Sequence, residues 1–268
     1  MNYDPVKNTL GVFFNQSVFF RKLFYRLLDL LLLRTWHIHR EIRSWRKTIK
    51  DDIRIFDAGS GFGQYTYFLH RLNPSWKILA VDVKDEQIAD CTTFFSKLKA
   101  KNVVFQTADL TQFVQEESFD LALSVDVMEH ILEDELVFRN IRKSLRQGGM
   151  LLISTPSDQG GSDVSEDSGE SFIGEHVRNG YNIQDIEQKL RSAGFTKVDA
   201  QFAYGTPGKI SWKLSMKYPI QMAGVSKIFL LILPFYFLIV YPFCFVLNYM
   251  DTYAHHTTGT GLIVKAWK

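Results

Sequence analysis

A glycine-rich turn directly after a short apolar run constrains this chain more than any other feature. The segment reads Ile53-Arg-Ile-Phe-Asp57-Ala-Gly59-Ser-Gly61-Phe-Gly63. The run predicts a strand that ends in an acid and turns through alternating glycines into a helix, where a ligand can lie against the backbone. A nicotinamide-binding turn would read G-x-G-x-x-G, but here position 64 is Gln. Asp57 also suits a cationic amino group better than a pyrophosphate; the alternative is a structural turn without a ligand.

The remainder of the chain alternates short β-rich apolar runs with helical patterns, which is typical of βαβ units. We expect strands near 53–57, 77–82, 102–107, 119–125 and 149–155, and helices near 63–72, 85–100 and 133–146. A helix near 183–193, a strand near 195–204 and a last strand over 261–268 follow the acidic, loop-like residues 156–182. The predicted fold class is therefore α/β, a Rossmann-like doubly wound sheet.

Acidic residues end four successive predicted strands. Asp82 comes 25 residues after Asp57, and Asp109 and Asp126 end the next two strands. Each acid taken alone is an ordinary helix N-cap. Ligands of open α/β sheets bind outside the carboxyl ends of the strands, and an acid at the second strand takes ribose hydroxyls. The series therefore favours one shared ligand site.

Five motifs together resemble the class I S-adenosylmethionine-dependent methyltransferases, especially their UbiE/UbiG-like group. The motifs are Asp57–Gly63, Val81-Asp82, Ala108-Asp109-Leu110, Ser124-Val-Asp126-Val-Met-Glu129-His130 and Gly148-Gly149-Met-Leu-Leu-Ile-Ser-Thr-Pro156. The resemblance covers about residues 50–204 and the terminal strand, and it specifies no substrate. It implies a seven-stranded sheet with an antiparallel last strand and S-adenosyl-L-methionine as cofactor.

The resemblance also implies which residues hold that cofactor. The glycine turn contacts the methionine part, Asp82 the ribose, and Asp109 with Leu110 the adenine. The predicted cofactor-binding residues are Asp57, Gly59, Gly61, Gly63, Asp82, Val83, Asp109, Leu110 and Ser124.

Two histidines are the predicted bases for an alcohol or phenol acceptor. His130 ends the fourth motif and His176 lies in Gly174–Tyr181; an imidazole titrates near working pH. Glu129 is the third predicted catalytic residue, and the alternative is that both histidines are structural. In the ubiquinone-pathway O-methyltransferases that this motif resembles, such an acid-x-x-Glu-His group has been linked to a divalent metal, which would fall here on Asp126, Glu129 and His130. We favour no metal, because Glu-His is widespread in methyltransferases without one.

An uncharged stretch from Ile228 to Leu247 suggests contact with a membrane. As a helix its twenty residues would be about 30 Å long, the thickness of a bilayer core. A single span would leave the last strand of the sheet on the far side of the membrane. Pro234 and Pro242 also predict helix breaks. We expect an element that enters one leaflet and returns, beside an amphipathic helical segment 12–33 with its basic residues towards anionic lipid. The alternatives are a single span, a buried cap over the acceptor site, or a dimer interface.

Net charge and cysteine content narrow the remaining function classes. The net charge of +2 argues against a general nucleic-acid binder, although residues 21–50 hold nine Lys/Arg. Two cysteines without close partners indicate a reducing compartment. The predicted organisation is a basic helical segment (1–50), a catalytic domain (51–204), a hydrophobic insertion (205–255) and the final strand (256–268).

These features predict a methyltransferase on the cytoplasmic face of a membrane. Its acceptor is expected to be lipid-like, quinone-like or an aromatic polyene, methylated at oxygen. One alternative is a soluble small-molecule methyltransferase whose insertion is a lid or dimer element. The other is a membrane-bound cofactor-binding scaffold without turnover; the oligomeric state stays open.

Overall fold

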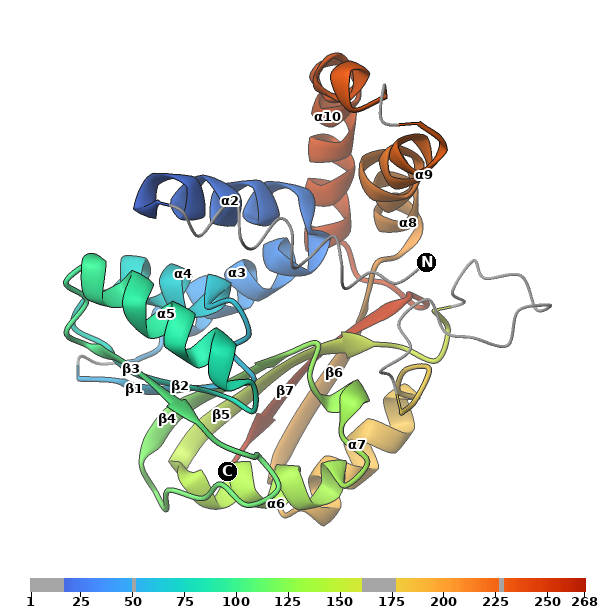
Figure 1. Cartoon of the computed structure of the whole chain (residues 1–268). Coiled ribbons are helices and arrows are strands. Elements are labelled where there is room, and N and C mark those ends of the chain that lie inside the picture. The colour runs from blue at the N-terminus through green and yellow to red at the C-terminus, as the bar shows by residue number, and fades with distance from the viewer. Residues whose placement is uncertain (1–16, 50–51, 161–176, 227–228) are drawn as a thin grey trace.

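A twisted seven-stranded sheet of order β3-β2-β1-β4-β5-β7-β6 forms the centre of the computed structural model, which describes residues 17–49, 52–160, 177–226 and 229–268 (Figure 1). The first five strands are parallel, and β7 lies antiparallel between β5 and β6. The α/β prediction and the antiparallel last strand are confirmed. The strands are β1 (Arg54–Ala58), β2 (Lys77–Asp82), β3 (Val103–Thr107), β4 (Phe119–Val125), β5 (Leu145–Pro156), β6 (Lys197–Ala203) and β7 (Gly261–Trp267).

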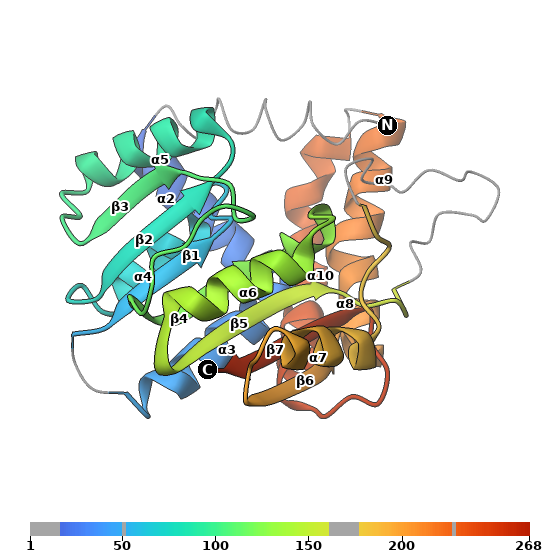
Figure 2. The ribbon, with the colours of Figure 1, turned by 90° about the horizontal axis from the view of Figure 1, so that it is seen from below.

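Helices cover both faces of the sheet (Figure 2). On one face, α3 (Leu33–Arg46) and α4 (Gln64–Leu72) bury Ile38 and Leu69 against the central strands. On the other, α6 (Asp134–Ser144) and α7 (Ile183–Ser192) bury Phe138 and Leu190. Because both faces are covered, the central strands bury consecutive apolar residues, such as Ile55 and Phe56 of β1, on both sides of the sheet. This leaves the carboxyl ends of the strands as the edge where polar residues gather.

The N-terminal segment, predicted to be helical, forms two separate helices within its described residues. Helix α2 (Val18–Leu31) begins after Ser17, whose side chain accepts a hydrogen bond from the Phe20 N–H. Leu32 is extended (φ −89°, ψ 110°) and separates α2 from α3. Residues 12–16 lie outside the described residues. The break lets α3 pack directly on the sheet, while α2 crosses over α4 and α5 on the same side (Figure 1).

The hydrophobic insertion is a helical hairpin that rises away from the sheet (Figure 1). The chain runs outward through α8 (Thr206–Trp212), a π-helical turn η3 (Lys213–Lys217) and α9 (Tyr218–Val225), and returns along α10 (Phe229–Tyr253). The expected helix breaks at Pro234 and Pro242 are wrong, because both prolines lie inside a continuous α10. Packing against α8 holds the helix despite the lost N–H donors; the Ser211 hydroxyl, for example, donates to Asn248 Oδ1 at 2.6 Å.

One buried carboxylate ties the base of this hairpin to the catalytic domain. Asp251 of α10 accepts hydrogen bonds from the backbone N–H groups of Tyr204 (3.1 Å) and Gly208 (2.9 Å). It also pairs with His37 of α3, whose Nε2 lies 2.9 Å from the carboxylate. A charge buried this deeply is stabilised only by such partners. The hairpin is therefore joined to the end of β6 and to helix α3.

Candidate active site

The glycine turn after β1 folds back onto β2. The N–H groups of Gly59 and Ser60 both donate to the carbonyl of Val81, at 2.9 and 2.8 Å. Gly59 has φ +87°, and a Cβ added there would lie 2.3 Å from Val127 Cγ2. Only glycine fits that contact. Gly61 also has positive φ, as does Gly63, which precedes α4 as its N-cap.

The acids of β1 and β2 flank this turn. Asp57 is buried and accepts a hydrogen bond from the Thr66 hydroxyl at 2.5 Å. Burial raises the pKa of Asp57 to about 6, and the nearby charge of Asp82 contributes to the rise against the Thr66 hydrogen bond. Asp82 accepts from the N–H groups of Gly61 (2.9 Å) and Lys84 (3.0 Å). The structure thus brings two of the predicted acids together around the turn.

The adjoining predicted residues lie along the same edge with different exposures. Asp109 follows β3, is exposed, and caps its own turn by accepting from the Thr111 N–H and hydroxyl at 2.8 Å each. Val83 is exposed as well, whereas the Leu110 side chain packs into the core. For Leu110, the backbone is therefore the part that can face a ligand.

Two buried hydroxyl groups beside the turn have no hydrogen-bond partner in the described part of the chain. They belong to Ser60, in the turn itself, and to Ser124, at the end of β4. Ser124 follows Leu123, which pairs directly with Asp57 of β1. Buried hydroxyls are almost always hydrogen-bonded. The pair therefore marks the turn as a place where a polar ligand completes the bonding.

Asp126, predicted as a strand-end acid, lies in a cluster whose other members the sequence did not reveal. Asp126, with φ +52°, forms an ion pair with Arg34 from the start of α3. The backbone N–H of Arg34 donates a hydrogen bond to the Tyr204 hydroxyl at 2.9 Å. The hydroxyl of Tyr65 lies 3.3 Å from that of Thr35, and burial raises the pKa of Tyr65 to about 12. These side chains come from four distant parts of the chain, so no local motif could have predicted them.

The turn after β4 holds two of the predicted catalytic residues. Glu129 and His130 lie in a short 3-10 helix, η1 (Met128–His130). Glu129 is buried and accepts from the Thr155 hydroxyl at 3.0 Å; burial, with the neighbouring Asp126 charge, raises the pKa of Glu129 well above its usual range. The third predicted residue, His176, lies outside the described residues.

Two of the three side chains considered for a divalent metal, Asp126 and Glu129, have other partners. Asp126 pairs with Arg34, and Glu129 with Thr155. Among the described residues, no group of three or more His, Cys, Asp or Glu side chains is placed to hold a metal ion.

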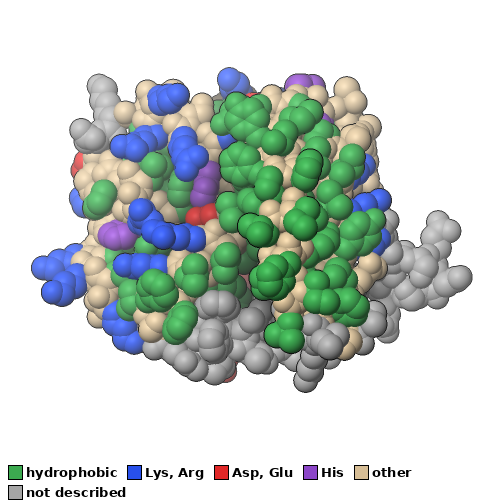
Figure 3. Space-filling model, turned by 90° about the horizontal axis from the view of Figure 1, so that it is seen from above, with side chains coloured by type: hydrophobic (Ala, Val, Ile, Leu, Met, Phe, Trp, Pro, Cys, Tyr) green, Lys and Arg blue, Asp and Glu red, His purple; other side chains and the backbone are tan. Residues whose placement is uncertain are grey.

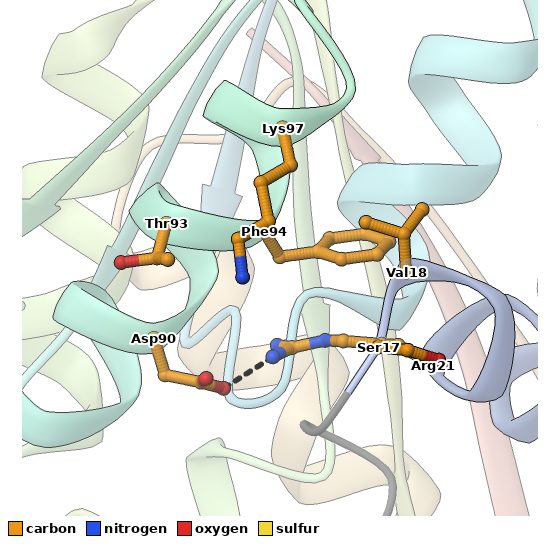
Figure 4. Close-up of a pocket in the computed structure, with 7 residues that line it drawn as sticks. All are labelled: Ser17, Val18, Arg21, Asp90, Thr93, Phe94 and Lys97. Carbon is orange, nitrogen blue, oxygen red and sulfur yellow. Dashed lines mark hydrogen bonds and ion pairs between the residues drawn. The ribbon is translucent and has the colours of Figure 1, made fainter.

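Helix α2 is fastened to the glycine turn from outside. The Tyr25 hydroxyl and Arg21 Nη2 both donate to the carbonyl of Phe62, the latter at 3.0 Å. Arg21 also pairs with Asp90 of α5 (Asp85–Lys97), across a small pocket of about 20 Å³ at the junction of the two helices (Figure 4). The expectation that the basic residues of this helix face lipid is therefore wrong for Arg21, which is buried because it bonds to the turn.

A seven-stranded sheet with antiparallel β7, a glycine turn after β1 and acids at the following strand ends define the class I S-adenosylmethionine-dependent methyltransferases. The profile of a methyltransferase domain family matches residues 49–203. The match covers more than half of the chain, which belongs to this family.

Two curated proteins named as O-methyltransferases are similar to part of this chain. The chain is 35% identical over 103 residues to the malonyl-[acyl-carrier protein] O-methyltransferase of Bacillus cereus, covering 38% of this chain and 37% of that protein. It is 32% identical over 107 residues to the human mitochondrial ubiquinone biosynthesis O-methyltransferase, covering 38% and 28%. The chain thus matches well under half the length of either relative.

Phosphoethanolamine N-methyltransferase 2 of Haemonchus contortus, solved in complex with S-adenosyl-L-methionine, has a similar fold. The TM-score is 0.60 at 19% identity, over 86% of this chain and 52% of that one.

Proposed function

We propose that this chain transfers the methyl group of S-adenosylmethionine to an oxygen of a hydrophobic acceptor at a membrane surface. The observation that carries the proposal is an exposed apolar hairpin that continues directly from β6, beside the end of the sheet where the site residues lie. The similar proteins named above as O-methyltransferases support the reaction class.

The cofactor supplies an activated methyl group, and the residues at the strand ends fit its other parts. We assign the glycine turn and Asp57 to the methionine part, Asp82 with Val83 to the ribose, and Asp109 with the Leu110 backbone to the adenine. Support comes from the close approach at Gly59, which a side chain would fill, and from the unpartnered hydroxyls of Ser60 and Ser124. A ligand at the turn would satisfy both hydroxyls.

His130 is the base that the surroundings favour. Glu129 is buried and already accepts a hydrogen bond from Thr155, whereas the neighbouring His130 is only partly buried and is the more accessible of the two. An imidazole accepts a proton near neutral pH, and His130 directly follows Glu129 at the end of η1. A role for His176 stays a prediction.

The surface of the hairpin supports a membrane partner. Within the described residues, one helical stretch, Leu231–Tyr253, is long and apolar enough to cross a bilayer, with a mean hydropathy of 2.1 and only 11% of its apolar window buried. Large exposed apolar patches mark sites of contact with a protein partner or a membrane. Figure 3 shows this apolar surface gathered on one face of the molecule.

Topology favours a leaflet-docked hairpin over a span. The hairpin leaves the sheet at β6 and re-enters it at β7, so both of its ends lie on the same side of any membrane. We therefore place it in one leaflet on the cytoplasmic face. The exposure of α10 favours an external apolar partner over a cap buried above the acceptor.

The proposed activity is tested by incubating the full chain with methyl-labelled S-adenosylmethionine and a lipid extract. Label is expected in the organic phase, and His130→Ala should lower the turnover number by about 100-fold or more, as expected for a lost general base. Label that stays in water-soluble products would indicate a soluble acceptor. No transfer to either fraction would point to a scaffold without turnover.

Cofactor affinity should depend on the ionisation of Asp57. Because the pKa of Asp57 is raised to about 6, its carboxylate is charged above that pH and neutral below it. Only the charged form attracts the cationic amino group, so affinity should fall as pH drops through about 6. Calorimetric titrations across this range check the slope. In Asp57→Asn the slope should be absent; the same slope in that variant would assign the pH dependence to another group.

A further inference from the structure

A basic hollow lies beside α2, outside the proposed active site. Its volume is about 390 Å³, and it is lined by Lys22, Arg26, Tyr67, His70, Arg71 and Leu98. The lining contains three permanent cations and no acid. No carboxylate in the described ranges forms an ion pair within 4 Å with Lys22, Arg26 or Arg71. The nearby Asp29 accepts from the Gln64 side chain at 2.8 Å, and its charge acts on Arg71 without a direct contact. The hollow therefore presents a net positive charge.

The charged residues of this hollow come from two helices, α2 and α4, and Leu98 at the C-cap of α5 completes its lining. Lys22 and Arg26 lie one helical turn apart on α2, and His70 and Arg71 lie in the last turn of α4. His70 is oriented by Asn102, whose Oδ1 lies 2.9 Å from the ring Nδ1. The Arg71 guanidinium lies 5.8 Å from the centre of the Tyr67 ring. Two of the lining side chains are thus held in place by neighbours.

The outer surface of α2 continues from the hollow as an apolar face. Phe19 is 70% exposed, and Leu23, Leu27 and Leu30 are exposed at helical spacing. The Leu30 carbonyl accepts from the Tyr241 hydroxyl at 2.8 Å, which joins α2 to α10. Figure 3 shows Lys and Arg side chains gathered beside the apolar surface. A helix with this division of faces lies in the plane of a bilayer interface, where its cations meet the headgroups.

We propose that the hollow binds the headgroup of an anionic phospholipid, whose acyl chains continue along the exposed face of α2. This inference rests on the proposed membrane docking and adds a specific lipid site to it. Charge complementarity and continuity with the apolar face commit the site to a membrane lipid. Each cation near an anionic surface adds to the affinity for that surface.

Vesicle flotation of the full chain tests the site. One set of vesicles contains phosphatidylcholine alone, and the other also contains phosphatidylglycerol, at physiological salt. The variant Arg26→Gln/Arg71→Gln removes one cation from each wall of the hollow. The control Arg139→Gln/Lys143→Gln removes two cations from α6, across the sheet (Figure 1). We expect the first variant alone to lose roughly 10-fold or more of the preference for anionic vesicles, with unchanged binding to neutral ones.

Three results would overturn the lipid site. Equal losses in the two variants would show that net charge, and not the hollow, sets the preference. Equal binding of the unmodified chain to both vesicle types would leave membrane docking intact and remove the headgroup site. Binding to neither type would remove the docking on which the site rests.

Discussion

Replacing Gly59 with alanine is expected to weaken S-adenosylmethionine binding by at least about 100-fold, or roughly 3 kcal/mol. The new Cβ would lie 2.3 Å from Val127 Cγ2, and φ +87° strains any L side chain. Relief requires the turn or the segment after β4 to move. Either movement shifts the N–H groups that hold the turn on Val81. Calorimetric titration measures the loss, and thermal unfolding shows whether the variant is still folded.

Gly148→Ala is the matched control for this change. Gly148 also has positive φ (+76°), but a Cβ there would have no neighbour within 4 Å. Gly148→Ala should lower the free energy of unfolding by roughly 1 kcal/mol, because only the strain of the left-handed backbone is added. Its affinity for the cofactor should be unchanged. If Gly59→Ala bound the cofactor as tightly as Gly148→Ala does, the glycine turn would not be the cofactor site.

Leu238→Asp is expected to reduce vesicle binding by about 100-fold or more. Leu238 is 76% exposed on α10, so the change should leave the folded domain intact. Moving from leucine to aspartate in a hydrocarbon environment costs about 3 kcal/mol on insertion scales. Flotation with neutral vesicles isolates this apolar contribution from the headgroup charge.

Val104→Asp controls for the loss of any exposed apolar side chain. Val104 lies on the edge strand β3 and is also exposed, but it is remote from the hairpin (Figure 1). It should bind vesicles as the unmodified chain does. If Leu238→Asp also bound normally while a dimer in solution dissociated, the hairpin would be a contact between copies of the chain.

The features that the sequence predicted well are those set by local pattern. The strands ending at Asp57 and Asp82 carry apolar runs followed by acids, and parallel pairing brings those ends to one edge. The terminal strand was equally predictable, since Leu262, Ile263 and Val264 are buried between β5 and β6.

Features that depend on packing between distant segments could not be predicted. Arg34 belongs to a basic stretch in the sequence, yet it turns inward to Asp126, 92 positions away. Arg21 is one of the basic residues expected to face lipid, yet it bonds to the carbonyl of Phe62. Pro234 predicts a helix break, which the packing of α10 against α8 overrides. In each case the deciding partner is far away in the sequence.

Titration of the full chain with S-adenosylmethionine, alongside Asp82→Asn, shows whether the strand ends hold the cofactor. We predict one bound cofactor per chain in the unmodified protein. Affinity should fall roughly 10-fold or more in the variant, because a charge-assisted hydrogen bond to the ribose contributes about 1.5–3 kcal/mol. Absence of binding to the unmodified chain, or equal affinity in the two proteins, would contradict the assignment of these strand ends as the cofactor site.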